Sequence, residues 1–155
     1  MNGFRELRRK DRAMDSSWAI SILKKADFGI LCTHDGSYPY GVPVNYFYED
    51  GVIYIHSAKE GHKIDNIKTN NKVCFVVVGS CQIIPQEFST KYESVVVFGK
   101  AELLQDVDVI EPLRKIVQKY SPQYTEQAEK VIEQYLKDTY IIKINIEHIQ
   151  GKARN

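Results

Sequence analysis

The sequence predicts a mainly β fold, an antiparallel barrel or sandwich that carries flanking helices. Two observations lead to this fold class. Six short segments are rich in β-branched and aromatic residues: 28–34, 40–48, 52–57, 73–79, 93–104 and 139–149. Tight-turn signals, Asp35-Gly36 and Glu49-Asp50-Gly51, separate the first three of them as hairpins do. Short strands joined by hairpin turns favour an antiparallel sheet over a parallel α/β sheet.

Length, charge and cysteine content narrow the class of protein. The chain has 155 residues and a net charge of +1, so we expect a single domain over residues 1–155 and no bulk binding of nucleic acid. No apolar run approaches the roughly 20 residues of a membrane span, and the charged start is followed by no apolar signal segment. Three cysteines in unrelated contexts read as reduced thiols, so we expect a cytoplasmic protein without a membrane partner.

The first elements follow from helical spacing and turn chemistry. A helix over residues 16–26 comes first, with Ser16 as its cap. The strands between residues 28 and 57 then form a three-stranded antiparallel meander. Pro43 cannot donate to a ladder, so it marks an edge, a bulge or a position that faces a ligand. Residues 60–70 are predicted to form a short helix.

The second half alternates long strands with two helices. Segment 80–91 is predicted to be a loop between two strands. In the first of the following helices Asp108 and Glu111 suit a capping box, and Ser121-Pro122 opens the second. The apolar residues of this second helix are expected to face inward: Tyr124, Ala128, Val131, Ile132 and Tyr135. Residues 139–149 close the sheet, with Ile142, Ile144 and Ile146 on one face.

The densest polar cluster is HSAKEGHKIDNI, residues 56–67. It runs from the end of a strand into the start of a helix, where free backbone N–H groups and the helix dipole favour an anion. Ser57, Lys63 and His62 add a hydroxyl and positive charge, which together suit a phosphate monoester. A solvated helix start explains the same residues equally well.

The segment YPYGVPVNYFY, residues 38–48, offers a second binding surface. Its glycine and two prolines leave a rigid, open backbone on which a flat ring could lie between Tyr40 and Asn45; an irregular edge strand is the alternative. The histidines and cysteines have no metal-ligand spacing, so no metal site is predicted. We expect Cys32 and Cys74 in the core and Cys81 in a loop.

These segments, in this order, resemble the pyridoxamine-phosphate-oxidase-like flavoproteins with a split barrel, and most closely their nitroimidazole-resistance (Nim-type) branch. The matching residues are RRKDR (8–12), GVPVNY (41–46), residues 56–67, KYESVVVFGKAE (91–102), KYSP (119–122) and IEHIQGKAR (146–154). The resemblance implies a six-stranded antiparallel FMN-binding split barrel that works as a homodimer.

The resemblance also implies the cofactor-binding residues. The FMN phosphate would be held by His56, Ser57, His62 and Lys63, and the isoalloxazine ring would rest along Pro43, Val44 and Asn45. Glu93, Ser94 and Lys152 would approach the flavin, the first two from the second subunit. His62-Lys63 stands where the oxidases themselves carry an Arg-Lys pair, so a substrate other than pyridoxamine phosphate is expected.

The expected activity is an FMN-dependent reductase or other oxidoreductase of small aromatic acceptors, with a nicotinamide electron donor. His62 is the candidate catalytic residue, because histidine can donate a proton near neutral pH; contact with the phosphate alone is its other role. Tyr40, Tyr46 and the partner's Tyr92 would line the pocket. Two alternatives stay open: a flavin-binding protein without turnover, and a haem-binding split-barrel relative with a histidine ligand.

Overall fold

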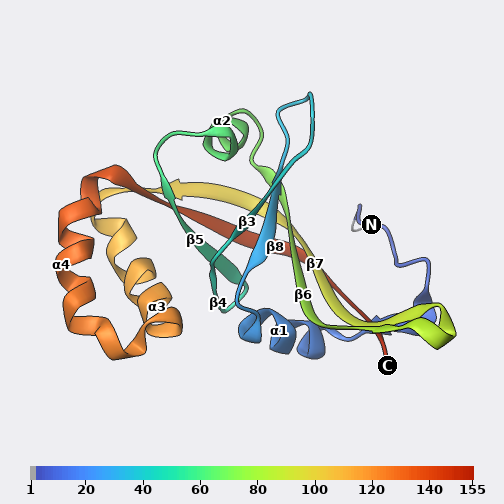
Figure 1. Ribbon diagram of the computed structural model, residues 1–155. Helices are drawn as coiled ribbons and strands as arrows, with labels where there is room; N and C mark the ends of the chain where they lie inside the picture. Colours follow the sequence, from blue (N-terminus) through green and yellow to red (C-terminus); the bar gives the residue numbers. More distant parts are fainter. Residues whose placement is uncertain (1–2) are drawn as a thin grey trace.

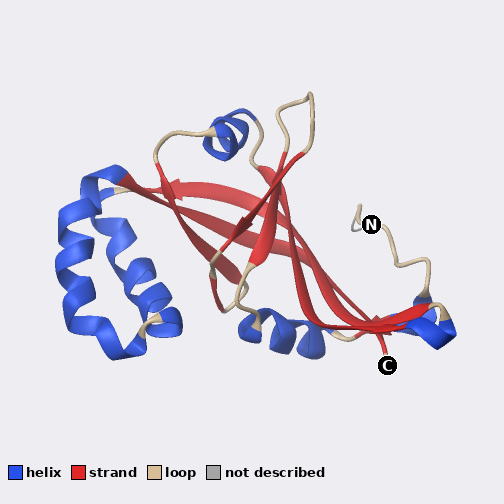
Figure 2. Ribbon diagram, in the orientation of Figure 1, coloured by secondary structure: helices blue, strands red, loops and turns tan. Residues whose placement is uncertain are grey.

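One antiparallel sheet of eight strands dominates the computed structural model, which describes residues 3–155 (Figures 1 and 2). The strands are β1 (Ala13–Met14), β2 (Gly29–Thr33), β3 (Tyr40–Val44), β4 (Phe47–Glu49), β5 (Val52–Ala58), β6 (Lys72–Ile84), β7 (Ser89–Leu104) and β8 (Thr139–Arg154). The helices are α1 (Ser16–Lys25), α2 (His62–Thr69), α3 (Ile110–Tyr120) and α4 (Thr125–Tyr135). The predicted fold class, mainly β with flanking helices, is confirmed.

The strand order, β3-β2-β6-β7-β8-β5-β4, explains why eight strands replace the expected six. The predicted strand 40–48 breaks at Asn45-Tyr46 into β3, which pairs with β2, and β4, which pairs with β5. The predicted meander is therefore wrong in its middle, because β3 and β4 lie at opposite ends of the order. The eighth strand is the short β1, which pairs with the end of β8.

Segment 80–91 is not a loop. Strand β6 continues to Ile84 and β7 begins at Ser89, so that only the 3-10 turn Pro85–Glu87 and Phe88 separate them. Together with the end of β8, which runs past the predicted residue 149 to Arg154, this hairpin projects from the barrel (Figure 1). We call residues 78–94 and 150–154 the arm. The side chains that β6 contributes to the arm are mostly exposed. This part of the sequence therefore lacks the alternation of apolar residues by which a strand is recognised.

The barrel interior holds the core. It is formed by fully buried side chains that include Leu23, Phe75 and Val97, together with Ile53, Ile55, Ile142 and Ile144. Helix α1 packs on this sheet, and its cap is Asp15 instead of the predicted Ser16: an Asp15 carboxylate oxygen accepts from Trp18 N at 2.8 Å. The predicted capping box is also absent among the described residues, since Asp106–Val109 forms a 3-10 turn ahead of α3.

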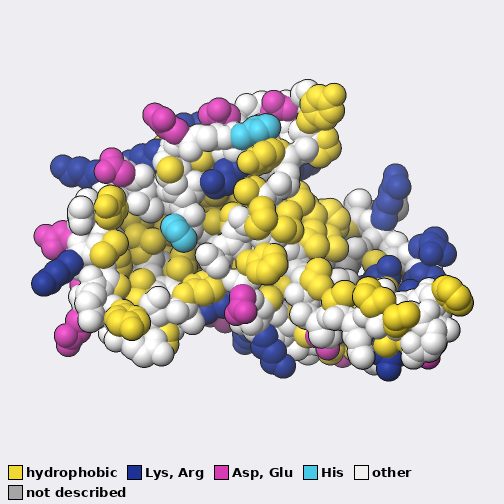
Figure 3. Space-filling view, viewed as in Figure 1, with side chains coloured by type: hydrophobic (Ala, Val, Ile, Leu, Met, Phe, Trp, Pro, Cys, Tyr) yellow, Lys and Arg dark blue, Asp and Glu magenta, His cyan; other side chains and the backbone are white. Residues whose placement is uncertain are grey.

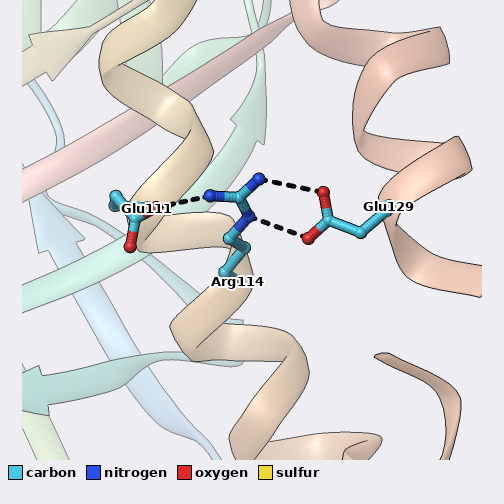
Figure 4. A network of polar contacts seen from close by, with 3 residues as sticks. All are labelled: Glu111, Arg114 and Glu129. Carbon is cyan, nitrogen blue, oxygen red and sulfur yellow. Dashed lines mark hydrogen bonds and ion pairs between the residues drawn. The ribbon is translucent and has the colours of Figure 1, made fainter. Parts of the chain in front are cut away.

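Helices α3 and α4 form an antiparallel pair at the end of the barrel opposite the arm (Figure 1). Arg114 on α3 bonds Glu111 at 2.6 Å and both carboxylate oxygens of Glu129 on α4, at 2.8 and 3.1 Å (Figure 4). Of the residues that the predicted second helix was expected to turn inward, Ile132 is buried, but Val131 and Tyr135 on α4 and Tyr124, in the 3-10 turn just before it, are exposed. That expectation was wrong because α4 packs on α3 and leaves one apolar side uncovered.

Residues 3–155 include no helix that is both long enough and apolar enough to cross a membrane.

Candidate functional site

The start of α2 presents free backbone N–H groups. Gly61 precedes the helix with a φ of 132°, a conformation that favours glycine. The first helical bond runs from Asp65 N to Gly61 O at 3.0 Å, so the N–H groups of His62, Lys63 and Ile64 have no acceptor within the helix. No side chain of residues 3–155 caps them. This end of the helix, with the Lys63 ammonium group, can bind an anion.

His56 lies near Lys63 and opens onto an apolar groove. Although the His56 side chain is exposed overall, partial desolvation of its ring lowers the pKa of His56, and the Lys63 charge lowers this pKa further, which favours a neutral imidazole at neutral pH. The groove has a volume of about 580 Å³, and Figure 3 shows its hydrophobic lining beside α3 and α4. The lining residues are His56, Leu113, Ile116, Val117, Ser121, Tyr124, Gln127, Ala128, Val131, Ile132, Tyr135 and Thr139.

The edge of β3 presents its backbone and two side chains to the outside. Pro43 and Asn45 are exposed, whereas Val44 packs against the core, so Val44 can meet a ligand only through its main chain. The Asn45 amide donates to the Asp27 carbonyl at 3.1 Å. This bond fixes Asn45 where the chain leaves β3 for β4.

A network from the end of α3 holds the same corner. The Tyr120 hydroxyl donates to the Asp27 carbonyl at 2.7 Å and accepts from Tyr46 N at 3.0 Å. The Lys119 ammonium group donates to the carbonyls of Ala26 and Tyr46, at 2.8 and 3.0 Å. The sequence places Tyr120 only on the apolar stripe of the predicted helix and predicts no role for Lys119, although the KYSP segment that carries them is part of the family resemblance.

The other predicted phosphate ligands point in different directions. Neighbouring side chains of a strand face opposite sides, so Ser57 is buried while His56 faces outward. The Ser57 hydroxyl donates to the Ala58 carbonyl at 2.8 Å. The His62 ring stacks on Tyr40, with ring centroids 4.0 Å apart. Tyr46 is fully buried, so the expectation that it lines an open pocket was wrong.

Glu93, Ser94 and Lys152 lie in the arm. The Ser94 hydroxyl donates to the Lys152 carbonyl at 3.3 Å. His56 on β5 pairs with Ile141 of β8, and Ser94 on β7 pairs with Lys152 of β8. These partners are 11 residues apart, about 35 Å at the rise of a strand. One chain therefore does not bring the arm residues to the groove. Residues 3–155 contain no group of three or more metal-ligating side chains placed to hold an ion.

Several solved structures resemble this one. A protein described as a candidate 5-nitroimidazole antibiotic resistance protein from Bacteroides thetaiotaomicron is 26% identical, with a TM-score of 0.70, and the match covers 90% of this chain and 85% of that chain. The flavocytochrome Anf3 from Azotobacter vinelandii is 21% identical, with a TM-score of 0.83 and coverage of 97% and 73%. A FAD-binding protein from Mesorhizobium loti is 24% identical, with a TM-score of 0.70 and coverage of 93% and 98%.

The two structures with identities under 25% show the shared fold alone. No curated protein matches the sequence. The family model for pyridoxamine 5′-phosphate oxidase matches residues 15–153, which takes in every strand from β2 to β7 and nearly all of β8. By this match the chain belongs to the pyridoxamine 5′-phosphate oxidase family.

Proposed function

We propose that the protein binds FMN at the open side of the split barrel and uses it to reduce small aromatic acceptors. The observation that carries the proposal is the uncapped start of α2, where three backbone N–H groups and Lys63 stand beside His56. These groups fit a phosphate monoester dianion. The flavin bound by the Mesorhizobium loti relative and the flavocytochrome Anf3 support a flavin as the ligand.

The ring of the flavin would lie along the β3 edge from Pro43 to Asn45. Asn45 is held by Asp27, so its position is fixed before a ligand arrives. The apolar groove next to His56 offers a water-poor site for the acceptor, since most of its lining is carbon. Bound FMN would supply the electrons, drawn from a nicotinamide donor.

The active form would be a homodimer. Glu93, Ser94 and Lys152 are about 35 Å along β8 from the partners of His56, so they reach a ligand beside His56 only if the arm of a second copy extends over the groove of the first. The arm carries the exposed apolar residues Val78, Ile83 and Phe88, which such a contact would cover. Light scattering should give twice 17.9 kDa; a monomer that still holds FMN would overturn this part.

His62 has two roles to separate. Its ring stacks on Tyr40 at the start of α2, which favours an anchoring role beside the phosphate over proton donation to the acceptor. If His62 only anchors FMN, His62→Gln weakens FMN binding and saturating FMN restores turnover. If it serves the acceptor, FMN affinity stays near normal and turnover falls by roughly 10²–10⁴-fold.

Haem binding is the second candidate function. His56 borders a groove with a mostly apolar lining, and a histidine against apolar walls is a common haem ligand arrangement. The flavocytochrome Anf3 is a relative in fold that carries both kinds of cofactor by its name. The third candidate function is binding of flavin without catalytic turnover.

The visible spectrum of the purified protein separates these candidates. FMN gives flavin absorption bands and haem gives a Soret band, and the cofactor released on denaturation can be identified. Reduction of a nitroaromatic or a quinone by the FMN-loaded protein, with either nicotinamide donor, then separates an enzyme from a binding protein. A protein that takes up no flavin at micromolar concentration would overturn the proposed function.

A further inference from the structure

Two cysteines lie side by side on the outer face of the sheet, away from the residues assigned to FMN. Cys32 on β2 and Cys74 on β6 are directly opposed in an antiparallel pair. Their strand neighbours Leu31 and Phe75 are fully buried, so both thiols face outward. Neither is part of a disulfide. This corrects the expectation that both are core residues.

The backbone spacing of this pair suits a disulfide bond. Directly opposed residues of an antiparallel pair have Cα atoms about 4.5 or 5.5 Å apart. Both values fall inside the range of about 4.4–6.8 Å that natural disulfides span. Burial raises the pKa of both thiols, and the neighbouring Cys32 sulfur raises the pKa of Cys74 further.

A cavity of about 400 Å³ opens onto the two sulfurs. Lys72 and Lys100 line it, and they are directly opposed on β6 and β7. Like charges in this arrangement repel each other. No carboxylate of residues 3–155 forms an ion pair with either lysine, although Glu147 also lines the cavity. The charge at the entrance therefore favours small anions.

We propose that Cys32 and Cys74 are a thiol–disulfide exchange site for small anionic disulfides, which convert the pair reversibly into a cross-strand disulfide bond. The Cys32 thiolate attacks one sulfur of the small disulfide, whose S–S bond breaks and releases one thiolate. Cys74 then loses its proton to water and attacks the Cys32 sulfur, which releases the second thiolate. The protein loses two protons and two electrons, and the small disulfide becomes two thiols.

Cys32 is the attacking group for an electrostatic reason. Burial raises the pKa of both thiols, and it raises that of Cys74 to about 11. Cys32, with the smaller rise, holds the larger thiolate fraction. Because both fractions are small at neutral pH, the exchange is slow compared with that of an activated thiol.

Oxidised glutathione serves as the anionic probe, and the protein is alkylated and analysed by peptide mass spectrometry after incubation. A peptide that links Cys32 to Cys74 is expected, and dithiothreitol should restore both thiols. In Cys74→Ser the reaction should stop at a glutathione adduct on Cys32. Cys81, which is exposed on the arm, reports single-thiol chemistry, and Cys81→Ser should still give the linked peptide. If Cys32 and Cys74 stay fully alkylatable while Cys81 reacts, the proposal fails.

The lysines are tested by comparing the anionic probe with neutral 2-hydroxyethyl disulfide. In the double variant Lys72→Gln and Lys100→Gln, the rate with oxidised glutathione should fall by roughly threefold or more relative to the neutral probe. The double variant Lys130→Gln and Lys137→Gln, which makes the same change in net charge on the α4 side, should leave the ratio unchanged. An equal fall for both probes would refute the selection for anions.

Discussion

Replacing Lys63 with alanine tests the phosphate site at α2 most directly. Lys63 is in the first turn of the helix, where alanine is the best helix former, so the helix itself should persist. A hydrogen bond to a charged group contributes about 1.5–3 kcal/mol. Loss of that bond to the phosphate should raise the FMN dissociation constant by about tenfold to 150-fold. The three backbone N–H groups remain, so binding should weaken and not vanish.

The quenching of flavin fluorescence on binding gives the dissociation constant in a titration of the cofactor-free protein. Lys68→Ala is the matched control, because Lys68 is on the same helix but lies over the Tyr140 ring, 5.8 Å from its centroid. Its affinity for FMN should stay within about twofold of that of the unchanged protein. An unchanged constant for Lys63→Ala, or an equal loss in both variants, would refute the placement of the phosphate at the start of α2.

Three further outcomes follow from particular contacts. The pKa of His56 is lowered by burial first and by Lys63 second, so Lys63→Ala should raise it in an NMR titration. The lowered pKa means that protonation of His56 destabilises the folded state. The stability that neutral His56 contributes is complete above the pKa of the unfolded chain, near 6.5, and is lost as the pH falls through the pKa of the folded state. The free energy of unfolding should therefore fall with pH below pH 7, and it should fall less steeply in Lys63→Ala. Gly99→Ala would place a Cβ 2.4 Å from the Asn145 carbonyl oxygen, so denaturant melting should show a free energy of unfolding lower by about 2–3 kcal/mol or more. In the control Gly41→Ala the new Cβ meets atoms only at 3.4 Å and beyond, so the free energy of unfolding should change by less than about 1 kcal/mol. Lys119→Met should cost about 1–3 kcal/mol in the same assay, because the Ala26 carbonyl loses the Lys119 donor and the Tyr46 carbonyl keeps only the Tyr120 hydroxyl. A loss no larger than that of Lys115→Met, which breaks a surface ion pair with Glu49, would contradict this account.

Most of the fold could be predicted because local signals agree with it. Asp35-Gly36 and Glu49-Asp50-Gly51 mark two of the hairpins in the structure, β2–β3 and β4–β5. What local signals do not contain is the pairing between distant segments. The break at Asn45-Tyr46 depends on the contact of Asn45 with Asp27, 18 residues away, and on that of Tyr46 with Tyr120, 74 residues away. No short-range pattern in the sequence reveals contacts of this range.

The candidate site was predicted in part for the same reason. Residues 56–67 identify the helix start at α2 from sequence, and the structure places Lys63 beside His56 there. The groove went unrecognised because Tyr124, Val131 and Tyr135 have the helical spacing of a buried face, and spacing does not distinguish burial from a lined cavity. The cysteine pair was missed because the opposition of Cys32 and Cys74 depends on the register of β2 against β6.

The position of β8 in the sheet governs the order in which this protein can fold. That strand, formed by residues 139–154, pairs with β1, β5 and β7. Strand β5 is therefore joined to β6 and β7 only through a segment made more than 80 residues later. Contacts of such long range slow folding, because the chain loses loop entropy before they form. The β6–β7 hairpin and the α3–α4 pair can form early from local contacts, and β5 stays an open edge until β8 has been synthesised. During synthesis this edge is the segment most exposed to wrong pairing with another chain.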